Sequence, residues 1–163
     1  MQPPIEFVLM VNKQGQTRLS RYFKPLLSSD KTLLEAELIR RCLGRGEDEC
    51  NFLEIREHKV VYRRYASLYF IVGTRDSQDV NELGLLEFVH LFVETMDKYF
   101  ENVCELDIMF NIEKVHMILA EMLSNGYIVE TNKSAILSPL VYMDRVPSQS
   151  NVYSALGSMF GAT

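Results

Sequence analysis

Two stretches of the chain are apolar at nearly every position, namely residues 5–12 (IEFVLMVN) and 66–73 (ASLYFIVG). A strand with one face in water alternates apolar and polar residues, whereas a strand covered on both faces does not. We therefore expect both stretches to be strands at the centre of a sheet that carries helices on both faces.

Three weaker strands flank these two. Residues 17–23 follow the first central strand across residues 13–16 (KQGQ), a short turn with a glycine that predicts a hairpin. Residues 52–56 and 59–64 lead into the second central strand through very tight turns, which predicts a three-stranded meander. Hairpins and meanders make antiparallel pairs, so the predicted strand order, numbered along the chain, is 2-1-5-4-3.

Apolar residues at helical spacing mark the remaining elements. Leu34, Leu38 and Cys42 lie four residues apart and predict an amphipathic helix, with Ser28-Ser29-Asp30 offering its N-terminal cap. We expect helices at residues 32–43, 85–100, 107–125 and 134–142, the third closed by Asn125-Gly126. The predicted fold class is α+β, a five-stranded antiparallel sheet flanked by helices on both faces.

Composition indicates one globular domain. The chain has 163 residues, of which 47% are hydrophobic and 24% charged. We expect the domain to span residues 1–143 and the Ser-, Gly- and Ala-rich stretch 144–163 to be a flexible tail. A net charge of -5 argues against nucleic-acid binding as the main function. No window approaches the ~18 apolar residues of a membrane span, and three cysteines are too few for a disulfide framework.

Residues that usually carry catalysis form no recognisable motif. His58, His90 and His116 fall on separate predicted elements, and the sequence has no metal-ligand spacing, phosphate loop or nucleophile elbow. Glu105 and Asp107 lie at a helix start, where acidic side chains cap free N–H groups. We therefore expect no catalytic residues, no metal site and no cofactor.

Basic residues on the predicted strands are the more informative set. They are Lys13, Arg18, Arg21, Lys59, Arg63 and Arg64. Adjacent strand residues point to opposite faces, so Arg63 and Arg64 cannot share one. A basic spot on an edge strand would suit an acidic peptide or a membrane headgroup, but such charges equally protect an edge from aggregation. The pattern leaves both readings open.

The predicted helix at residues 85–100 has apolar residues on more than one side. Such a helix is either buried all round or contacts another protein. This favours an interaction subunit over an enzyme.

Three long segments resemble the small (sigma) subunits of the adaptor protein complexes of vesicle coats. They are FVLMVNKQGQTRLSRYF (7–23), KVVYRRYASLYFIVG (59–73) and the stretch from LEFVHLF to VETNK (86–133). The resemblance covers roughly residues 5–143. Within the family, MVNKQGQTRL and the ending from GYIVET to LSPL look most like the sigma subunits of adaptor complex four.

The resemblance implies a longin-like fold, which agrees with the predicted strand order. It implies a core subunit of a heterotetramer, held chiefly by the N-terminal solenoid of a large adaptin chain, beside a second large chain and a medium chain. It further implies sorting of membrane cargo into coated vesicles at the trans-Golgi network, with peripheral membrane association on the cytosolic face through the complex. No nucleic-acid partner and no cofactor are implied.

In clathrin-type adaptors this family helps to bind the acidic dileucine signal, an acidic residue followed four positions later by two leucine-like residues. Arg18 matches the arginine near the acidic position. The positions that match the leucine pockets are Ala66, Leu68, Val93, Asn102, Val103, Leu106 and Ile108. Ala66 and Leu68 are two residues apart, so we expect them to share one sheet face, beneath the helix that carries Val93.

The alternatives of the same kind are a sigma subunit of adaptor complex one or two, and the small subunit of the coatomer. From a different class, a small hydrolase or a nucleotide-dependent regulator would need a nucleophile–base pair or a phosphate loop. The sequence shows neither motif.

Overall fold

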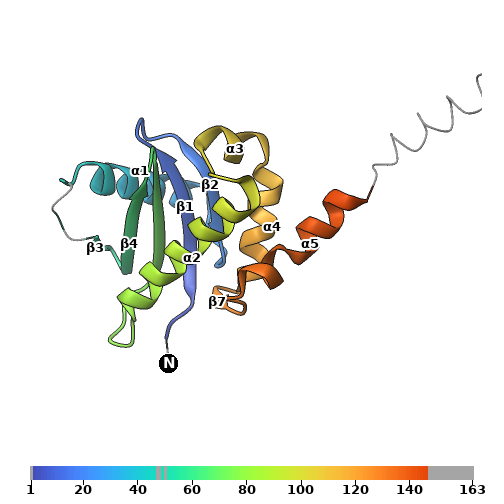
Figure 1. The fold of residues 1–163 in the computed structure, drawn as a ribbon. Helices are drawn as coiled ribbons and strands as arrows, with labels where there is room; N and C mark the ends of the chain where they lie inside the picture. Colours follow the sequence, from blue (N-terminus) through green and yellow to red (C-terminus); the bar gives the residue numbers. More distant parts are fainter. Residues whose placement is uncertain (1, 47–48, 50, 147–163) are drawn as a thin grey trace, which may run out of the picture.

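The computed structural model describes residues 2–46, 49 and 51–146. Its centre is one five-stranded antiparallel sheet with the order β2-β1-β5-β4-β3 (Figure 1). The strands are β1 (Ile5–Asn12), β2 (Thr17–Tyr22), β3 (Phe52–Ile55), β4 (His58–Tyr65) and β5 (Leu68–Arg75). The predicted strand order and the antiparallel pairing are confirmed.

Helices cover both faces of this sheet. They are α1 (Ser28–Leu43), α2 (Glu82–Phe100), α3 (Glu105–Phe110), α4 (Ile112–Met122) and α5 (Lys133–Arg145). Figure 1 shows α1 against one face and α2 crossing the other, with α4 and α5 beside α2. The predicted α+β architecture with helices on both faces is therefore confirmed.

The two central strands divide the core into two clusters. Val8 and Met10 of β1 pack with apolar residues of α2, α4 and α5, whereas Phe7 and Leu9 pack with the buried face of α1. All four side chains are at most 1% exposed. Burial on both faces explains why β1 and β5 carry no alternating polar residues, as the sequence predicted.

The turn between β4 and β5 comprises Ala66 and Ser67, whereas we expected it at Tyr65. Ala66 has a left-handed backbone with φ 53°, and β5 begins only at Leu68, while β4 continues to Tyr65. The expectation that Ala66 and Leu68 share a sheet face is therefore wrong, because Ala66 belongs to the turn and not to the strand.

The predicted helix at residues 107–125 is also wrong in extent. Asn111, with φ -127° and ψ 36°, separates α3 from α4. Beyond Met122 the chain forms a small hairpin of β6 (Leu123–Ser124) and β7 (Tyr127–Ile128). Asn125 and Gly126 both have positive φ, 49° and 85°, as a two-residue hairpin turn of type I′ requires. An Asn-Gly pair closes helices as well as hairpins, and here it closes a hairpin.

The other helices are longer than predicted. Ser28-Ser29-Asp30 lie within the first turn of α1 and do not cap it, since the N-cap is Leu27 and makes no side-chain cap bond. The side chain of Asn81 accepts a hydrogen bond from the Gly84 backbone N–H and starts α2 three residues earlier than expected. These differences extend helices without changing the architecture.

The last helix extends past residue 143, where we expected the tail to begin. Asp144 lies in α5 and accepts hydrogen bonds at 2.7 Å from both Lys114 Nζ and Tyr99 Oη. The first residues of the expected tail are therefore helical and tied to α2 and α4. Residues 147–163 lie outside the described residues.

Gly126 is the glycine whose replacement should damage the fold most clearly. Its φ is +85°, and a Cβ there would lie 2.1 Å from the carbonyl oxygen of Ile5. The Gly126 carbonyl also accepts a 2.8 Å hydrogen bond from the Ile5 N–H, so the two backbones cannot separate freely. We expect Gly126→Ala to lower the free energy of unfolding by about 1–3 kcal/mol. Chemical denaturation of the full chain measures this change.

Gly46→Ala is the matched control for this prediction. Among the residues that the structure describes, a Cβ at Gly46 would come within 4 Å only of the flexible Glu49 side chain, at 3.9 Å. Its effect should stay within about 0.5 kcal/mol. Equal stabilities of the two variants would contradict the close packing of the β6–β7 turn against β1.

Candidate functional site

Arg18 occupies a β-bulge on the outer strand β2. Met10 lies opposite Leu19 and Val11 opposite Thr17, so Arg18 has no partner residue on β1. A bulge at a sheet edge bends the strand and re-aims the side chain. Here the bulge accompanies an Arg18 side chain that reaches the N-terminus of α3.

Arg18 forms an ion pair with Glu105, the first residue of α3. The distance from Arg18 Nε to Glu105 Oε1 is 2.8 Å, and the two side chains are 24% and 23% exposed. Arg18 Nη2 also donates to Gln16 Oε1 at 2.9 Å. Asn12 Nδ2 donates to both Gln16 Oε1 and Glu105 Oε1, each at 2.9 Å. We call Asn12, Gln16, Arg18 and Glu105 the Arg18 cluster.

Asn12 holds this cluster to the β1–β2 turn. It is 2% exposed, and its Oδ1 accepts hydrogen bonds from the backbone N–H groups of Gln14 and Gln16 at 3.0 and 2.9 Å. The amide is thus satisfied on both its oxygen and its nitrogen, as a buried polar group requires. Sequence reasoning missed Asn12, although a polar residue that ends an apolar strand just before a glycine turn is a usable signal.

Glu105 and Asp107 have different roles, which corrects the expectation that both cap α3. Only Asp107 does so, because its Oδ2 accepts a 2.9 Å hydrogen bond from the backbone N–H of Cys104. Glu105 turns instead to the β-hairpin. Hydrogen bonds from Asn12 and Arg18 lower the pKa of Glu105 below its ordinary value, so this carboxylate is ionised at neutral pH.

Three of the residues expected to line leucine pockets are core residues. Leu68 of β5, Val93 of α2 and Ile108 of α3 are 4%, 6% and 0% exposed. All three belong to the core cluster on the α2 side of the sheet. A ligand reaches these nearly buried side chains only if neighbouring residues move.

The junction between α2 and α3 lies above this apolar floor. Asn102 is exposed and has a left-handed backbone with φ 73°. Val103 is half-buried against the same core cluster, and its N–H donates to Asp97 Oδ1 at 3.0 Å. Leu106 is 59% exposed. Val103 precedes Glu105 by two residues and Leu106 follows it directly, so both are close along the chain to a member of the Arg18 cluster.

The Ala66–Ser67 turn lies at the same end of the sheet. Asn12, the last residue of β1, pairs with Leu68, the first residue of β5. Ala66 is exposed and does not lie over the apolar floor. It lines a cavity of about 510 Å³ together with Tyr62, Arg64 and Tyr69. Ala66 therefore shares an end of the sheet, but not a face, with Leu68.

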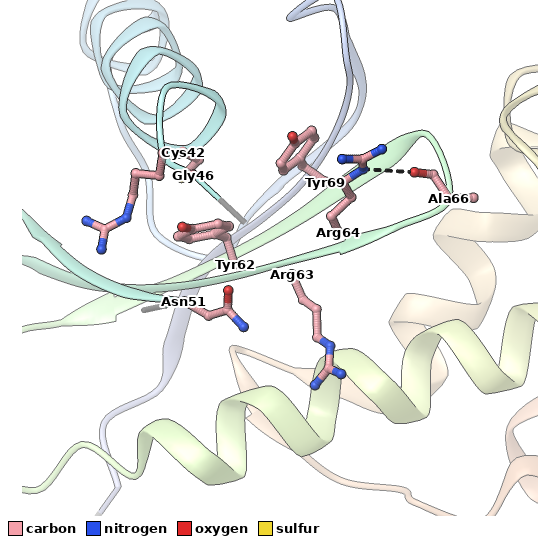
Figure 2. A pocket seen from close by; sticks show the side chains of 9 residues that line it. Cys42, Gly46, Asn51, Tyr62, Arg63, Arg64, Ala66 and Tyr69 are labelled. Atoms are coloured by element: carbon pink, nitrogen blue, oxygen red, sulfur yellow. Dashed lines mark hydrogen bonds between the residues drawn. The ribbon is translucent and has the colours of Figure 1, made fainter. Parts of the chain in front are cut away.

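Arg63 and Arg64 point to opposite faces, as predicted. Figure 2 shows Arg63 directed toward α2, whereas Arg64 lies beside Tyr69 on the other side of the sheet. Arg64 Nε donates to the carbonyl of Ala66 at 3.1 Å, and the Arg63 guanidinium lies 5.5 Å from the Tyr65 ring centroid. Because β1 and β5 separate β4 from β2, these arginines form no common patch with Arg18.

Two of the exposed apolar surfaces lie at α3 and α5. The α3 surface consists of Leu106, Met109 and Phe110, and Phe110 is 81% exposed. The α5 surface consists of Val141, Tyr142, Met143 and Val146. Figure 1 shows α5 projecting away from the sheet. The sequence left open whether the apolar helix now seen as α2 is buried all round or contacts another protein. Its centre is buried, because Phe88, Val89 and Phe92 are at most 2% exposed.

The histidines have structural partners or surroundings. His58 Nε2 lies 2.9 Å from Glu6 Oε2, and His90 Nε2 lies 3.0 Å from Glu94 Oε1, one helical turn away. Burial lowers the pKa of His116.

Among residues 2–46, 49 and 51–146, no group of three or more His, Cys, Asp or Glu side chains could hold a metal ion. Within the same residues, no helix combines the length and hydrophobicity that crossing a bilayer demands.

Comparison with known proteins supplies the family. The model of the family "Clathrin adaptor complex small chain" matches residues 4–147. The AP-4 complex subunit sigma of Arabidopsis thaliana is 59% identical over 86% of this chain and 97% of its own length. Human AP-4 complex subunit sigma-1 is 52% identical over 87% of this chain and 97% of its own length.

A sigma subunit of another complex is less similar. The AP-1 complex subunit sigma-1 of Saccharomyces cerevisiae is 44% identical over 93% of this chain and 97% of its own length. In three dimensions, a chain in a homology model of the full-length AP-3 complex in a stretched open conformation matches with a TM-score of 0.69. It is 26% identical and covers 91% of this chain and 98% of its own. The chain therefore belongs to the clathrin adaptor complex small chain family, the sigma subunits of the adaptor protein complexes.

Proposed function

We propose that this chain is the small core subunit of a heterotetrameric adaptor complex of the AP-4 type, which sorts membrane cargo at the trans-Golgi network. The observation that carries the proposal is the match to AP-4 sigma subunits over most of the chain, at 59% and 52% identity against 44% for the AP-1 relative. Its role is non-catalytic. The partners are two large chains and one medium chain, and the complex brings the subunit to the cytosolic face of the membrane.

The exposed apolar surfaces support a subunit role. Large apolar side chains on the α3 and α5 surfaces would stay in contact with water in an isolated chain, which is unfavourable by about 25 cal/mol per Å². Clustered exposed apolar groups of this kind mark protein interfaces. We propose that the N-terminal solenoid of one large chain covers part of this area. We also propose that residues 1–143, together with the last residues of α5, act as one domain within the assembly.

We further propose that the subunit takes part in binding acidic dileucine signals. Arg18 would receive the acidic residue, because a guanidinium is the side chain best suited to pair with a carboxylate. The two leucines would lie over Val103 and Leu106, with Leu68, Val93 and Ile108 as the apolar floor beneath them. Asn102 and Ala66 would stand at the rim.

The free energies expected for these contacts correspond to a dissociation constant in the micromolar range. Each buried leucine contributes roughly 1.5–3 kcal/mol, and a charge-assisted contact adds at most about 1.5–3 kcal/mol, the value for an arginine that has no other carboxylate partner. Ordering of the peptide and loss of its translational freedom remove several kcal/mol. A net value near -8 kcal/mol corresponds to a dissociation constant of about 1 μM, which suits transient cargo capture.

Assembly tests the subunit proposal directly. The tagged full chain, purified from cells of its own organism, should bring down two large chains and one medium chain in equal amounts. Native mass spectrometry of the eluate should give the mass of one four-chain complex. A tagged variant with Phe110→Asp and Tyr142→Asp should recover less of the complex while remaining folded, because both side chains are exposed. Recovery of the chain alone would contradict the proposal.

Val103 offers the sharpest test of cargo binding. We expect Val103→Gln in the assembled complex to weaken binding of an acidic peptide with two leucines by at least about tenfold, because one leucine loses its apolar contact. Isothermal titration calorimetry measures the affinity. Leu83→Gln makes the same kind of change at an exposed position at the start of α2 and should leave it unchanged. Equal affinities of the two variants would argue that the peptide binds elsewhere.

A further inference from the structure

Arg18 already holds a carboxylate in this structure. Its Nε lies 2.8 Å from Oε1 of Glu105, and its Nη2 is engaged by Gln16. The acidic residue of a sorting peptide would bring a second carboxylate to the same guanidinium. The peptide and Glu105 therefore compete for one cation.

Two arrangements are open to an incoming carboxylate, and Glu105 opposes both. If the peptide takes the whole guanidinium, the internal ion pair is lost. If the peptide takes only the outer nitrogens, two ionised carboxylates share one guanidinium and repel each other. Asn12 and Arg18 both favour the ionised form of Glu105, which keeps its negative charge in place. In either case the peptide carboxylate contributes less binding free energy than it would with an arginine that has no internal carboxylate partner.

Asn12 provides a second holding point for Glu105. Its Nδ2 binds the same carboxylate oxygen as Arg18 does, at 2.9 Å, and Asn12 is itself fixed by the backbone of the β1–β2 turn. Glu105 can therefore lose Arg18 without losing every hydrogen bond. This permits displacement by a peptide while α3 keeps its connection to the hairpin.

We propose that Glu105 is a specificity-determining residue of the cargo site, an internal competitor for Arg18 that reduces the contribution of the acidic residue in a sorting signal. The inference rests on the proposed cargo-binding function. It predicts that the leucine pair supplies most of the affinity in the native subunit. A peptide with Gln in place of its acidic residue should then bind the native complex within about threefold of the acidic peptide.

The test is a cycle of two complexes and two peptides. The native complex and the complex with Glu105→Gln are titrated with a peptide that carries Glu before the leucine pair, and with its Gln counterpart. In the variant, the Glu peptide should bind about tenfold more tightly than in the native complex, because Arg18 is relieved of its internal carboxylate. Affinity for the Gln peptide should not change. Glu113→Gln, at an exposed position of α4, removes the same charge and should alter neither affinity.

The outcomes separate the inference from the function on which it rests. If both peptides bind but the Glu105→Gln complex shows no new preference for the Glu peptide, Glu105 has only a structural role. That result overturns the inference alone. A preference of tenfold or more for the Glu peptide in the native complex overturns it as well, and this result does not depend on whether the variant folds. Absence of binding to every complex overturns the cargo-binding function and the inference together.

Discussion

The antiparallel pairing of β1 with β5 is the constraint on which the rest of the molecule depends. Each strand is buried on both faces, so their pairing separates one core cluster beneath α1 from another beneath α2, α4 and α5. The register sets Asn12 opposite Leu68, which brings the β1–β2 turn and the β4–β5 turn to one end of the sheet. The bulge at Arg18 and the N-terminus of α3 meet at this end.

Much of the fold could be predicted because apolar patterning reports burial. The runs around Val8 and Phe70 had no polar face, which marked both as central strands, and short turns then fixed the order of the other three. Turn chemistry was harder to predict. Ala66 adopts φ 53° although it sits in an apolar run, and Asn125-Gly126 closes a hairpin where a helix end fits the same residue types.

The candidate site could be predicted only in part. The family resemblance named Arg18 and the apolar positions, but sequence alone could not show that Arg18 is paired. Glu105 lies 87 residues from Arg18 and was assigned to capping, which any acidic residue at a helix start suggests. Long-range pairs of this kind depend on the register of the sheet and on a bulge, and neither leaves a local signal. Leu68, Val93 and Ile108, which were expected to line the leucine pockets, are likewise buried in the hydrophobic core.

A structure of the assembled complex with an acidic dileucine peptide bound tests this account most directly, and cryo-electron microscopy can supply it. We predict the peptide carboxylate on Arg18, Glu105 retained by Asn12 alone, and the leucines seated beside Val103 at the α2–α3 junction. A bound peptide that leaves the Arg18–Glu105 ion pair intact and lies away from this junction would contradict the account.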